Sequence, residues 1–181
     1  MSLAPALLVA MPQLVEPSFA RALVLLCEHA PEGAFGLIVN RPSEIAAAEA
    51  VRIEPKIASP NHLPLRLGGP VDPERGWILT SAAPETPEAQ SIGAGLYLSA
   101  SPLLLRRVLT ARPAPLQTHV LAGYAGWGPG QLDAELAQSS WLIMPVEHDL
   151  IFDVPADRAW ETAIRRLGAD PYLLQMGHGV H

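Results

Sequence analysis

ALVLLCEHAPEGAFGLIVNRP, the stretch from Ala22 to Pro42, consists of two apolar segments joined by a polar turn. The segments 22–29 and 34–40 have the length and the Val, Leu and Ile content that are typical of buried strands. The residues between them, 30–33, include a proline and end in a glycine, as hairpin loops often do. The stretch therefore predicts a β-hairpin, around which the rest of the chain can be arranged.

Short apolar runs elsewhere predict more strands, and short amphipathic runs predict helices. The further strands are expected at 7–11, 65–71, 76–81, 96–100, 116–125, 141–144 and 150–152, with 65–71 and 76–81 paired around a turn at 72–75. Helices are expected at 44–52 behind Ser43, from Pro102 behind Ser101, shortly after Gly130, and at 156–167. Strands outnumber helices without alternating regularly, which predicts an α+β fold with mostly antiparallel pairing.

The composition limits both the organisation and the class of protein. With 181 residues, 49% of them hydrophobic, the chain fits one compact domain, 1–181. Cys27 is the only cysteine, which excludes an intrachain disulfide and any metal site built from several cysteines. No apolar run approaches the roughly 20 residues that a membrane-spanning helix needs, and no secretory signal pattern is present. We expect a soluble, cytoplasmic protein with no membrane partner.

Glu28 and His29 are secondary site candidates, because a carboxylate beside an imidazole can support acid–base chemistry or bind a metal. Successive strand residues point to opposite faces, however, so the two cannot act on one atom unless a bulge intervenes. The alternative is that both are polar residues at the loop edge that hydrogen-bond the turn. No spacing of histidines points to a metal site, and no cofactor motif is present.

Asn40 and Arg41 could contact an oxyanion or a carboxylate, and Gly68 and Gly69 could add exposed backbone amides to the same site. If the hairpin loop is 30–33, His29 pairs with Ala34, Cys27 with Gly36 and Leu23 with Asn40. Asn40 would then lie at the opposite end of the hairpin from Glu28. The alternative is structural: a capped strand exit with an exposed arginine, and a tight glycine bend.

Tyr124 and Trp127 lie among glycines near the end of a predicted strand. Two aromatic rings there could form a flat wall on which a ligand stacks. The alternative is a pair of buried rings packed on a glycine-kinked strand. Cys27, in the middle of an apolar strand, is expected to be an inert, packed thiol.

Several longer stretches together carry a family resemblance. They are MPQLVEPSFARALVLLCEH, GAFGLIVNRP, LGGP with RGW shortly after it, LAGYAGWGPGQLDAEL and SSWLIMP. With these stretches the chain resembles the AlgH/YqgE family of small bacterial proteins, over most of its length and in family order, although 42–68 is shorter than the family pattern. The resemblance implies a bent, bifurcated sheet forming a pseudo-barrel, and the residue pattern described above adds about four short helices that flank it. Some members are named transcriptional regulators, although no DNA-binding motif explains that name.

Three functions are compatible with the residues. The first is a non-catalytic binding or regulatory module that acts through a protein partner or a small ligand, without metal or cofactor. The second is an enzyme on a small anionic substrate, with Asn40, Arg41 and the Gly68–Gly69 amides as its oxyanion site. The third is direct nucleic-acid binding by Arg106, Arg107 and Arg112, against which the net charge of −6 argues most strongly.

Overall fold

The computed structural model describes residues 1–83 and 87–177. The chain divides into two compact units, the first made of Met1–Asn40 and Ala125–His181 and the second of Arg41–Tyr124. The expectation of a single domain over 1–181 stays a prediction. The two terminal histidines that the sequence places in a glycine-rich tail, His178 and His181, lie outside the described residues.

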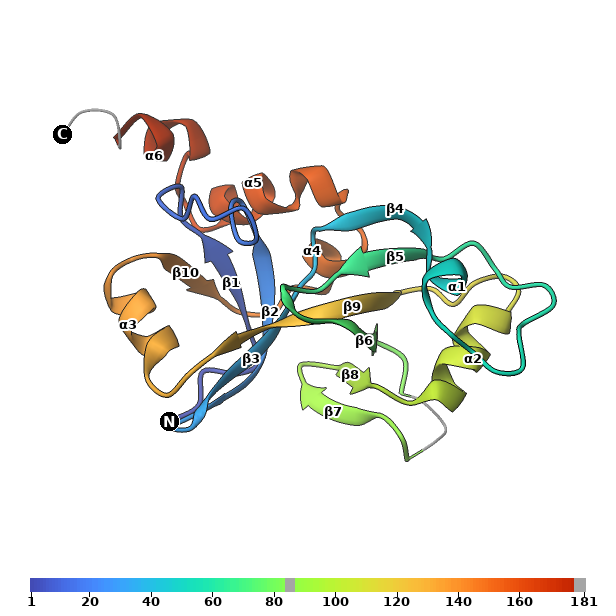
Figure 1. Ribbon diagram of the computed structural model, residues 1–181. Coiled ribbons are helices and arrows are strands. Elements are labelled where there is room, and N and C mark those ends of the chain that lie inside the picture. Colours follow the sequence, from blue (N-terminus) through green and yellow to red (C-terminus); the bar gives the residue numbers. More distant parts are fainter. Residues whose placement is uncertain (84–86, 178–181) are drawn as a thin grey trace. The chain divides into compact units, whose positions relative to one another are not determined.

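The first unit is built on an antiparallel sheet in the order β10-β1-β2-β3-β9 (Figure 1). Its strands are β1 (Ala6–Ala10), β2 (Leu23–Ala30), β3 (Gly33–Ile38), β10 (Trp141–Met144) and the end of β9 (Thr118–Trp127). All of β1 and the first five residues of β2 are buried. Strands covered on both faces have continuous apolar sequences, which is why these runs do not alternate.

The predicted hairpin is present, with a shorter loop and a different register. Only residues 31–32 lie outside the two strands, and His29 pairs with Ala34 as predicted. Beyond Glu28 the register shifts, so that Leu26 rather than Cys27 lies opposite Gly36. Cys27 is therefore an extra residue in β2, a β-bulge. The predicted pairings of Cys27 with Gly36 and of Leu23 with Asn40 are wrong by this one residue, because an apolar pattern does not reveal a bulge.

Four helices complete the described part of the first unit. They are α3 (Gln131–Ala137), α4 (His148–Phe152), α5 (Ala156–Arg166) and α6 (Pro171–Gly177). α5 packs against β1 and β2, and its Trp160 donates from Nε1 to the carbonyl oxygen of Ala10 at 2.7 Å. The strand predicted at 150–152 is wrong, because these residues belong to α4. In this helix Leu150 and Ile151 are both buried.

The second unit holds the remaining strands and helices. These are β4 (Pro42–Ala46), α1 (Ala47–Ala50), β5 (Pro64–Leu67), β6 (Val71–Thr80), β7 (Gln90–Gly93), β8 (Leu96–Ser99), α2 (Pro102–Thr110) and most of β9. β9 pairs with β6, with β5 and, inside the first unit, with β3, so the sheet branches at this strand. Only the β5–β9 pair is parallel among the strand pairs of the described residues. The α+β class, the mostly antiparallel pairing and the branched sheet are confirmed.

Two predictions for the second unit need correction. The helix expected at 44–52 is only the single turn α1, because residues 42–46 form β4, and the Ala47 amide donates to the Leu63 carbonyl at 2.8 Å. Tertiary pairing here overrides the helix preference of the alanines. The strands expected at 65–71 and 76–81 correspond to β5 and β6, but the residues of the turn expected at 72–75 belong to β6. The two strands pair with β9 and not with each other.

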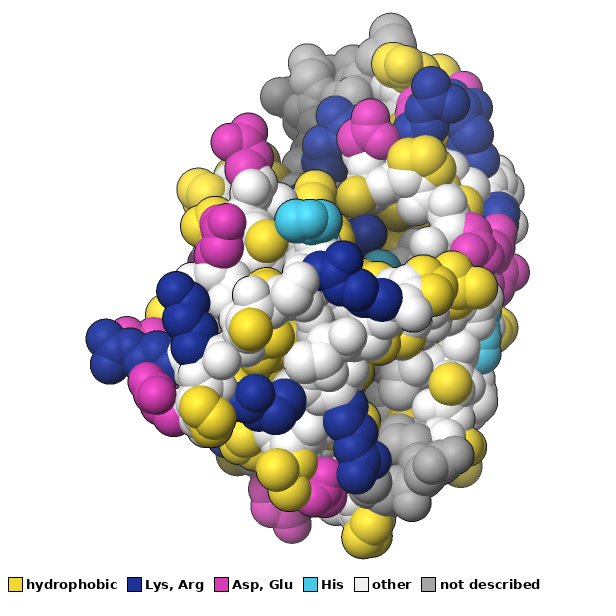
Figure 2. All heavy atoms as spheres, turned by 90° about the vertical axis from the view of Figure 1, so that its right-hand side faces the viewer, with side chains coloured by type: hydrophobic (Ala, Val, Ile, Leu, Met, Phe, Trp, Pro, Cys, Tyr) yellow, Lys and Arg dark blue, Asp and Glu magenta, His cyan; other side chains and the backbone are white. Residues whose placement is uncertain are grey.

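Helix α2 covers the core of the second unit and is closed at both ends. At its start the Ser101 hydroxyl accepts from the Leu104 amide at 3.3 Å, as the sequence predicts. At its end the buried Asn61 donates from Nδ2 to the carbonyls of Val108 and Ala111, at 2.7 and 3.0 Å. Asn61 thereby fixes the segment 51–63 beside α2. Figure 2 views the molecule from the side on which α1 and α2 lie.

Candidate functional site

Asn40 is part of the first unit, where both the oxygen and the nitrogen of its side-chain amide make hydrogen bonds. Its Oδ1 accepts from the Leu23 amide at 2.9 Å, and its Nδ2 donates to the Arg21 carbonyl at 3.0 Å. The side chain is only 7% exposed. Asn40 therefore ties the end of β3 to the start of β2, which corresponds to the structural alternative, and its role in binding a ligand stays a prediction.

His29 joins three parts of the first unit through its ring. The Leu3 amide donates to Nδ1 at 3.0 Å, so Nδ1 carries no proton and the hydrogen is on Nε2. Nε2 in turn lies 3.0 Å from the Asp133 carboxylate in α3 and donates to it. Both ring nitrogens are thus occupied, which leaves neither of them to accept a proton from a substrate.

Glu28 and Cys27 do not extend this cluster into a catalytic set. The bulge lies before Glu28, so Glu28 and His29 still alternate along β2, opposite Phe35 and Ala34. The Cys27 thiol is buried and donates to the Leu25 carbonyl at 3.5 Å. Burial, and secondarily the Glu28 carboxylate, raises the pKa of Cys27 to about 12. At neutral pH the thiol is protonated and is a poor nucleophile.

Trp127 packs in the core of the first unit with its indole edge bonded. Its ring meets Trp141 edge-on with centroids 6.0 Å apart, and Trp141 meets Phe19 at 5.8 Å. The indole nitrogens of Trp127 and Trp141 donate to the same oxygen, Oε1 of Glu135, at 3.4 and 3.1 Å. This is the buried-ring alternative. The helical spacing of polar residues in α3 was the only signal in the sequence for Glu135.

In the second unit, backbone contacts bring Arg41, Gly68, Gly69 and Tyr124 close together. The Leu67 amide donates to the Arg41 carbonyl at 2.8 Å, and the Gly68 amide donates to the Ala122 carbonyl at 2.7 Å. The carbonyl oxygen of Gly69 approaches the Cα of Gly123, the residue before Tyr124. Because the Gly68 amide is already bonded, it cannot serve as an oxyanion donor without a rearrangement of the sheet.

Arg66 joins this group, although sequence reasoning did not select it. It lies opposite Pro42 in the β4–β5 pair, so its backbone is next to that of Arg41. Both guanidinium groups are partly buried, and burial lowers the pKa of Arg41 and of Arg66. They nevertheless remain charged at neutral pH. A guanidinium group is chemically suited to contact an anion, and the LRLGG sequence around position 66 was the signal that could have identified the second arginine.

Tyr124 belongs to a small aromatic and charged cluster of the second unit. Its ring meets Trp77 edge-on at 6.2 Å, and its hydroxyl donates to Asp72 at 3.4 Å. The Arg75 guanidinium lies over the Trp77 ring, 4.5 Å from its centroid. Tyr124 therefore packs against Trp77 of the second unit, whereas Trp127 packs against Trp141 of the first unit. Among the described residues the two rings have no aromatic partner in common.

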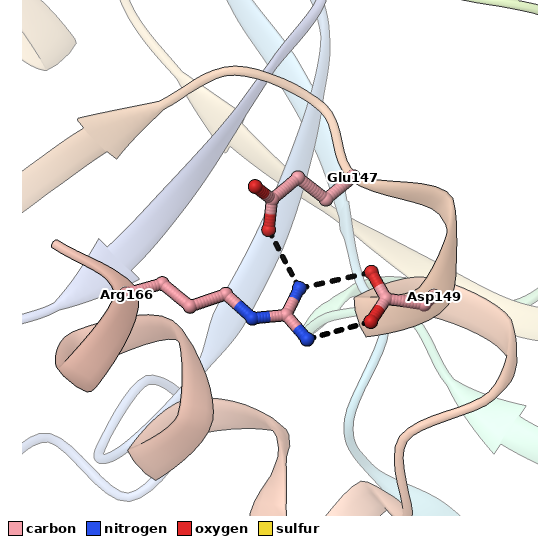
Figure 3. A network of polar contacts seen from close by, with 3 residues as sticks. All are labelled: Glu147, Asp149 and Arg166. Carbon is pink, nitrogen blue, oxygen red and sulfur yellow. Dashed lines mark hydrogen bonds and ion pairs between the residues drawn. The ribbon is translucent and has the colours of Figure 1, made fainter.

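The polar segment 146–149 contains two carboxylates, Glu147 and Asp149, and both are bound by the Arg166 guanidinium (Figure 3). The guanidinium donates to both oxygens of Asp149, at 2.9 and 2.6 Å, and to Glu147 at 2.7 Å. This hydrogen bonding is the main cause that lowers the pKa of Asp149 and raises that of Arg166. Within residues 1–83 and 87–177 no group of three or more His, Cys, Asp or Glu side chains is placed to hold a metal ion.

Replacing Asp149→Asn is expected to lower the free energy of unfolding by about 0.5–1 kcal/mol at neutral pH, the range for an exposed ion pair of good geometry. The pKa of Asp149 is lower in the folded protein than in the unfolded chain. The ion pair therefore stabilises the fold fully at pH values above the unfolded-state pKa, and this stabilisation is lost as the pH falls through the folded-state pKa. Urea unfolding should therefore separate the variant from the parent at neutral pH and not in strong acid. Glu32→Gln in the exposed hairpin turn is the control, and an equal loss in both variants would contradict the assignment.

Comparison with known proteins shows the family to which this sequence and fold belong. The AlgH-like family model, DUF179, matches residues 7–172. A UPF0301 protein of Anaeromyxobacter dehalogenans is 44% identical over 187 residues, covering 98% of this chain and 94% of that protein. A UPF0301 protein of Stenotrophomonas maltophilia is 38% identical over 176 residues, covering 96% of this chain and 93% of that protein.

Two solved structures are similar to this chain. The solution structure of AlgH from Pseudomonas aeruginosa has a TM-score of 0.77 and 35% identity, covering 93% of this chain and 90% of that one. A crystal structure of a Corynebacterium diphtheriae protein, 21% identical, shares the fold with a TM-score of 0.69 over 95% of this chain and 89% of its own. The resemblance predicted from the sequence is confirmed, and the chain belongs to the AlgH-like family.

Proposed function

We propose that the chain is a non-catalytic binding module that acts through a protein partner or a small ligand. The observation that carries this proposal is that the side chains best suited to chemistry are engaged within the first unit. His29 has both ring nitrogens occupied, Asn40 has both ends of its amide bonded, and the pKa of the Cys27 thiol is about 12. Groups used in this way stabilise a fold and do not transfer protons or attack a substrate.

The enzymatic alternative has less support from the same contacts. An oxyanion site made of Asn40 and the Gly68 amide needs two hydrogen-bond donors, and these already donate to the carbonyls of Arg21 and Ala122. The guanidinium groups of Arg41 and Arg66 can bind an anion, but they do not act as acids or bases near neutral pH. Binding without turnover is therefore the function that this chemistry favours.

A regulatory role would act through protein contacts in the cytoplasm. Net charge is −6, so long-range electrostatics oppose a nucleic acid, whereas protein partners of many charge patterns can bind. The lone cysteine is compatible with a reducing compartment. In the described part of the chain no helix has the length and apolar character required to cross a membrane.

The proposal is tested by capture and by thermal stability. Immobilised protein is exposed to a bacterial lysate, and retained proteins are identified by mass spectrometry against a resin carrying an unrelated acidic protein of similar size. In parallel, a panel of small phosphates and carboxylates is screened for a rise in unfolding temperature, which a ligand of the folded state must produce. A specific partner or a saturable shift is expected. Failure of both, or steady consumption of a screened compound, would contradict a binding module.

A further inference from the structure

Cationic side chains gather in two neighbouring segments of the second unit. Residues 50–63 and 101–117 together contain five lysines and arginines and a single acid, Glu54, although the whole chain has a net charge of −6. The first unit contains four cations and eleven acids, whereas the second contains eight and seven. Figure 2, which views the side of α1 and α2, shows Lys and Arg side chains across this face. The local charge is therefore opposite in sign to the total.

Hydrogen bonds hold these two segments side by side. Arg106 of α2 donates to the Pro55 carbonyl, and Arg112 donates to the Ser59 carbonyl and hydroxyl at 3.1 and 2.7 Å. Lys56, which follows Pro55 in the chain, is consequently next to the residue that Arg106 contacts. We call Lys56, Arg106, Arg107 and Arg112 the α2 patch. The hydrogen bonds of Arg106 and Arg112 hold the backbone that carries Lys56 beside α2, so the patch forms with the fold.

Part of the α2 patch is not used inside the fold. Lys56 and Arg107 are exposed, and within the described residues their side chains make no hydrogen bond or ion pair. In the first unit, by comparison, Arg165 pairs with Glu161 and Arg166 pairs with Glu147 and Asp149, while Arg158 is exposed. The helix dipole places partial negative charge at the C-terminal end of α2, which can explain the presence of Arg107 in the last turn. It does not explain Lys56, which lies outside the helix.

The same face of α2 also presents apolar surface. Leu103, Arg106, Arg107 and Thr110 share one face by helical spacing, while Leu104 and Val108 point into the core. The Leu103 side chain is 63% exposed. A partner with carboxylates could pair them with the guanidinium groups, and an apolar side chain of the same partner could pack on Leu103. Phosphate backbones would use only the charges and would leave the exposed Leu103 side chain without an apolar partner.

We propose that the α2 patch docks an acidic segment of a partner protein, in which Asp and Glu side chains surround at least one apolar side chain. This inference rests on the proposed binding function and names the surface and the chemistry of its partner. Charge complementarity supplies orientation and association rate, while Leu103 supplies contact area that salt does not screen. Binding should therefore weaken with added salt without vanishing.

The test uses a fluorescein-labelled peptide of alternating Glu and Leu residues and fluorescence anisotropy with the full chain at low ionic strength. The Lys56→Glu/Arg107→Glu variant should bind about ten-fold more weakly, because two exposed attractive pairs become repulsive. Lys56→Gln/Arg107→Gln should lose less. Arg158→Glu, an exposed arginine of α5 in the first unit, should leave the affinity near that of the parent. Circular dichroism and unfolding temperature confirm that all the variants are folded.

Four results of the binding measurements would overturn the α2 patch as this docking surface. These are no binding of the Glu–Leu peptide, equal binding of a Gln–Leu peptide, an equal effect of Arg158→Glu, and tighter binding of an oligothymidylate of the same length. A dimer that Lys56→Glu/Arg107→Glu abolishes in sedimentation would identify a second copy as the occupant and would also overturn it. If that variant still retains the partner captured from lysate, the patch fails while the proposed binding function stands.

Discussion

Replacing Gly123→Ala is expected to lower the free energy of unfolding by about 2–5 kcal/mol, combining backbone strain with a forced contact. Gly123 has φ of +76°, a conformation that alanine adopts only at a cost. A Cβ atom there would lie 2.3 Å from the Gly69 carbonyl oxygen and 3.2 Å from that of Val71. Both obstacles are backbone atoms, so relief requires the bend at 68–71 to move away from β9.

Gly130→Ala is the matched control for this experiment. Gly130 has φ of +71°, and among the described residues nothing outside its own chain surroundings lies within 4 Å of a Cβ placed there. It should therefore lose only the strain component, about 1–2 kcal/mol. Urea unfolding followed by circular dichroism gives both values. Equal losses in the two variants would show that the close approach of Gly69 to Gly123 does not contribute to stability.

The contact at Gly123 illustrates what the sequence could and could not predict. A run of glycines indicates a broken or bent strand, and the sequence predicted a strand at 116–125 interrupted by these glycines, where the structure has β9. Nothing in the run identifies which glycine is approached by a backbone far away in the chain. That information resides in the pairing of β5 and β6 on β9, and strand partners are set by tertiary packing.

The hairpin illustrates the same limit at a finer scale. Apolar composition and a Pro-Gly turn were sufficient to predict β2, β3 and their antiparallel pairing. The bulge at Cys27 was not predictable, because one inserted residue leaves an apolar run apolar. Its effect is to shift every pairing beyond it by one position. The strand predicted at 150–152 failed for a related reason, since three apolar residues satisfy a helix and a strand equally well.

For the candidate site, residue types were informative and their partners were not. Asn40 and His29 were selected because amides and imidazoles can perform chemistry. The structure engages them with the backbone of Arg21, Leu23 and Leu3. Those partners are distant in sequence or separated by a turn, and a backbone group has no signature in the amino-acid code. Polar residues that hold a fold together and polar residues that bind a ligand therefore look alike until the contacts are known.

Asn40→Asp is expected to lower the free energy of unfolding by about 3–5 kcal/mol at neutral pH, the range for an uncompensated buried charge. The new carboxylate could still accept from the Leu23 amide, but it would face the Arg21 carbonyl oxygen with no hydrogen to share. Arg21 has φ of +57°, so the contact that Asn40 makes also supports a strained turn. The nearly complete burial of this side chain prevents water from replacing the lost donor.

The pH dependence of the stability of Asn40→Asp tests specifically the loss of the Asn40 Nδ2 donor to the Arg21 carbonyl. Burial and the facing carbonyl raise the folded pKa of the introduced carboxyl above its unfolded value of about 3.9. Its protonated form can donate to Arg21, so stability is retained below the unfolded value and is lost as pH rises through the folded one. The difference between variant and parent should therefore be small in acid and large at neutral pH, while Gln90→Glu, exposed in β7, should show little difference at either. A neutral-pH loss below about 1 kcal/mol would mean that the bonds to Arg21 and Leu23 contribute little and that the Asn40 amide is available to a ligand.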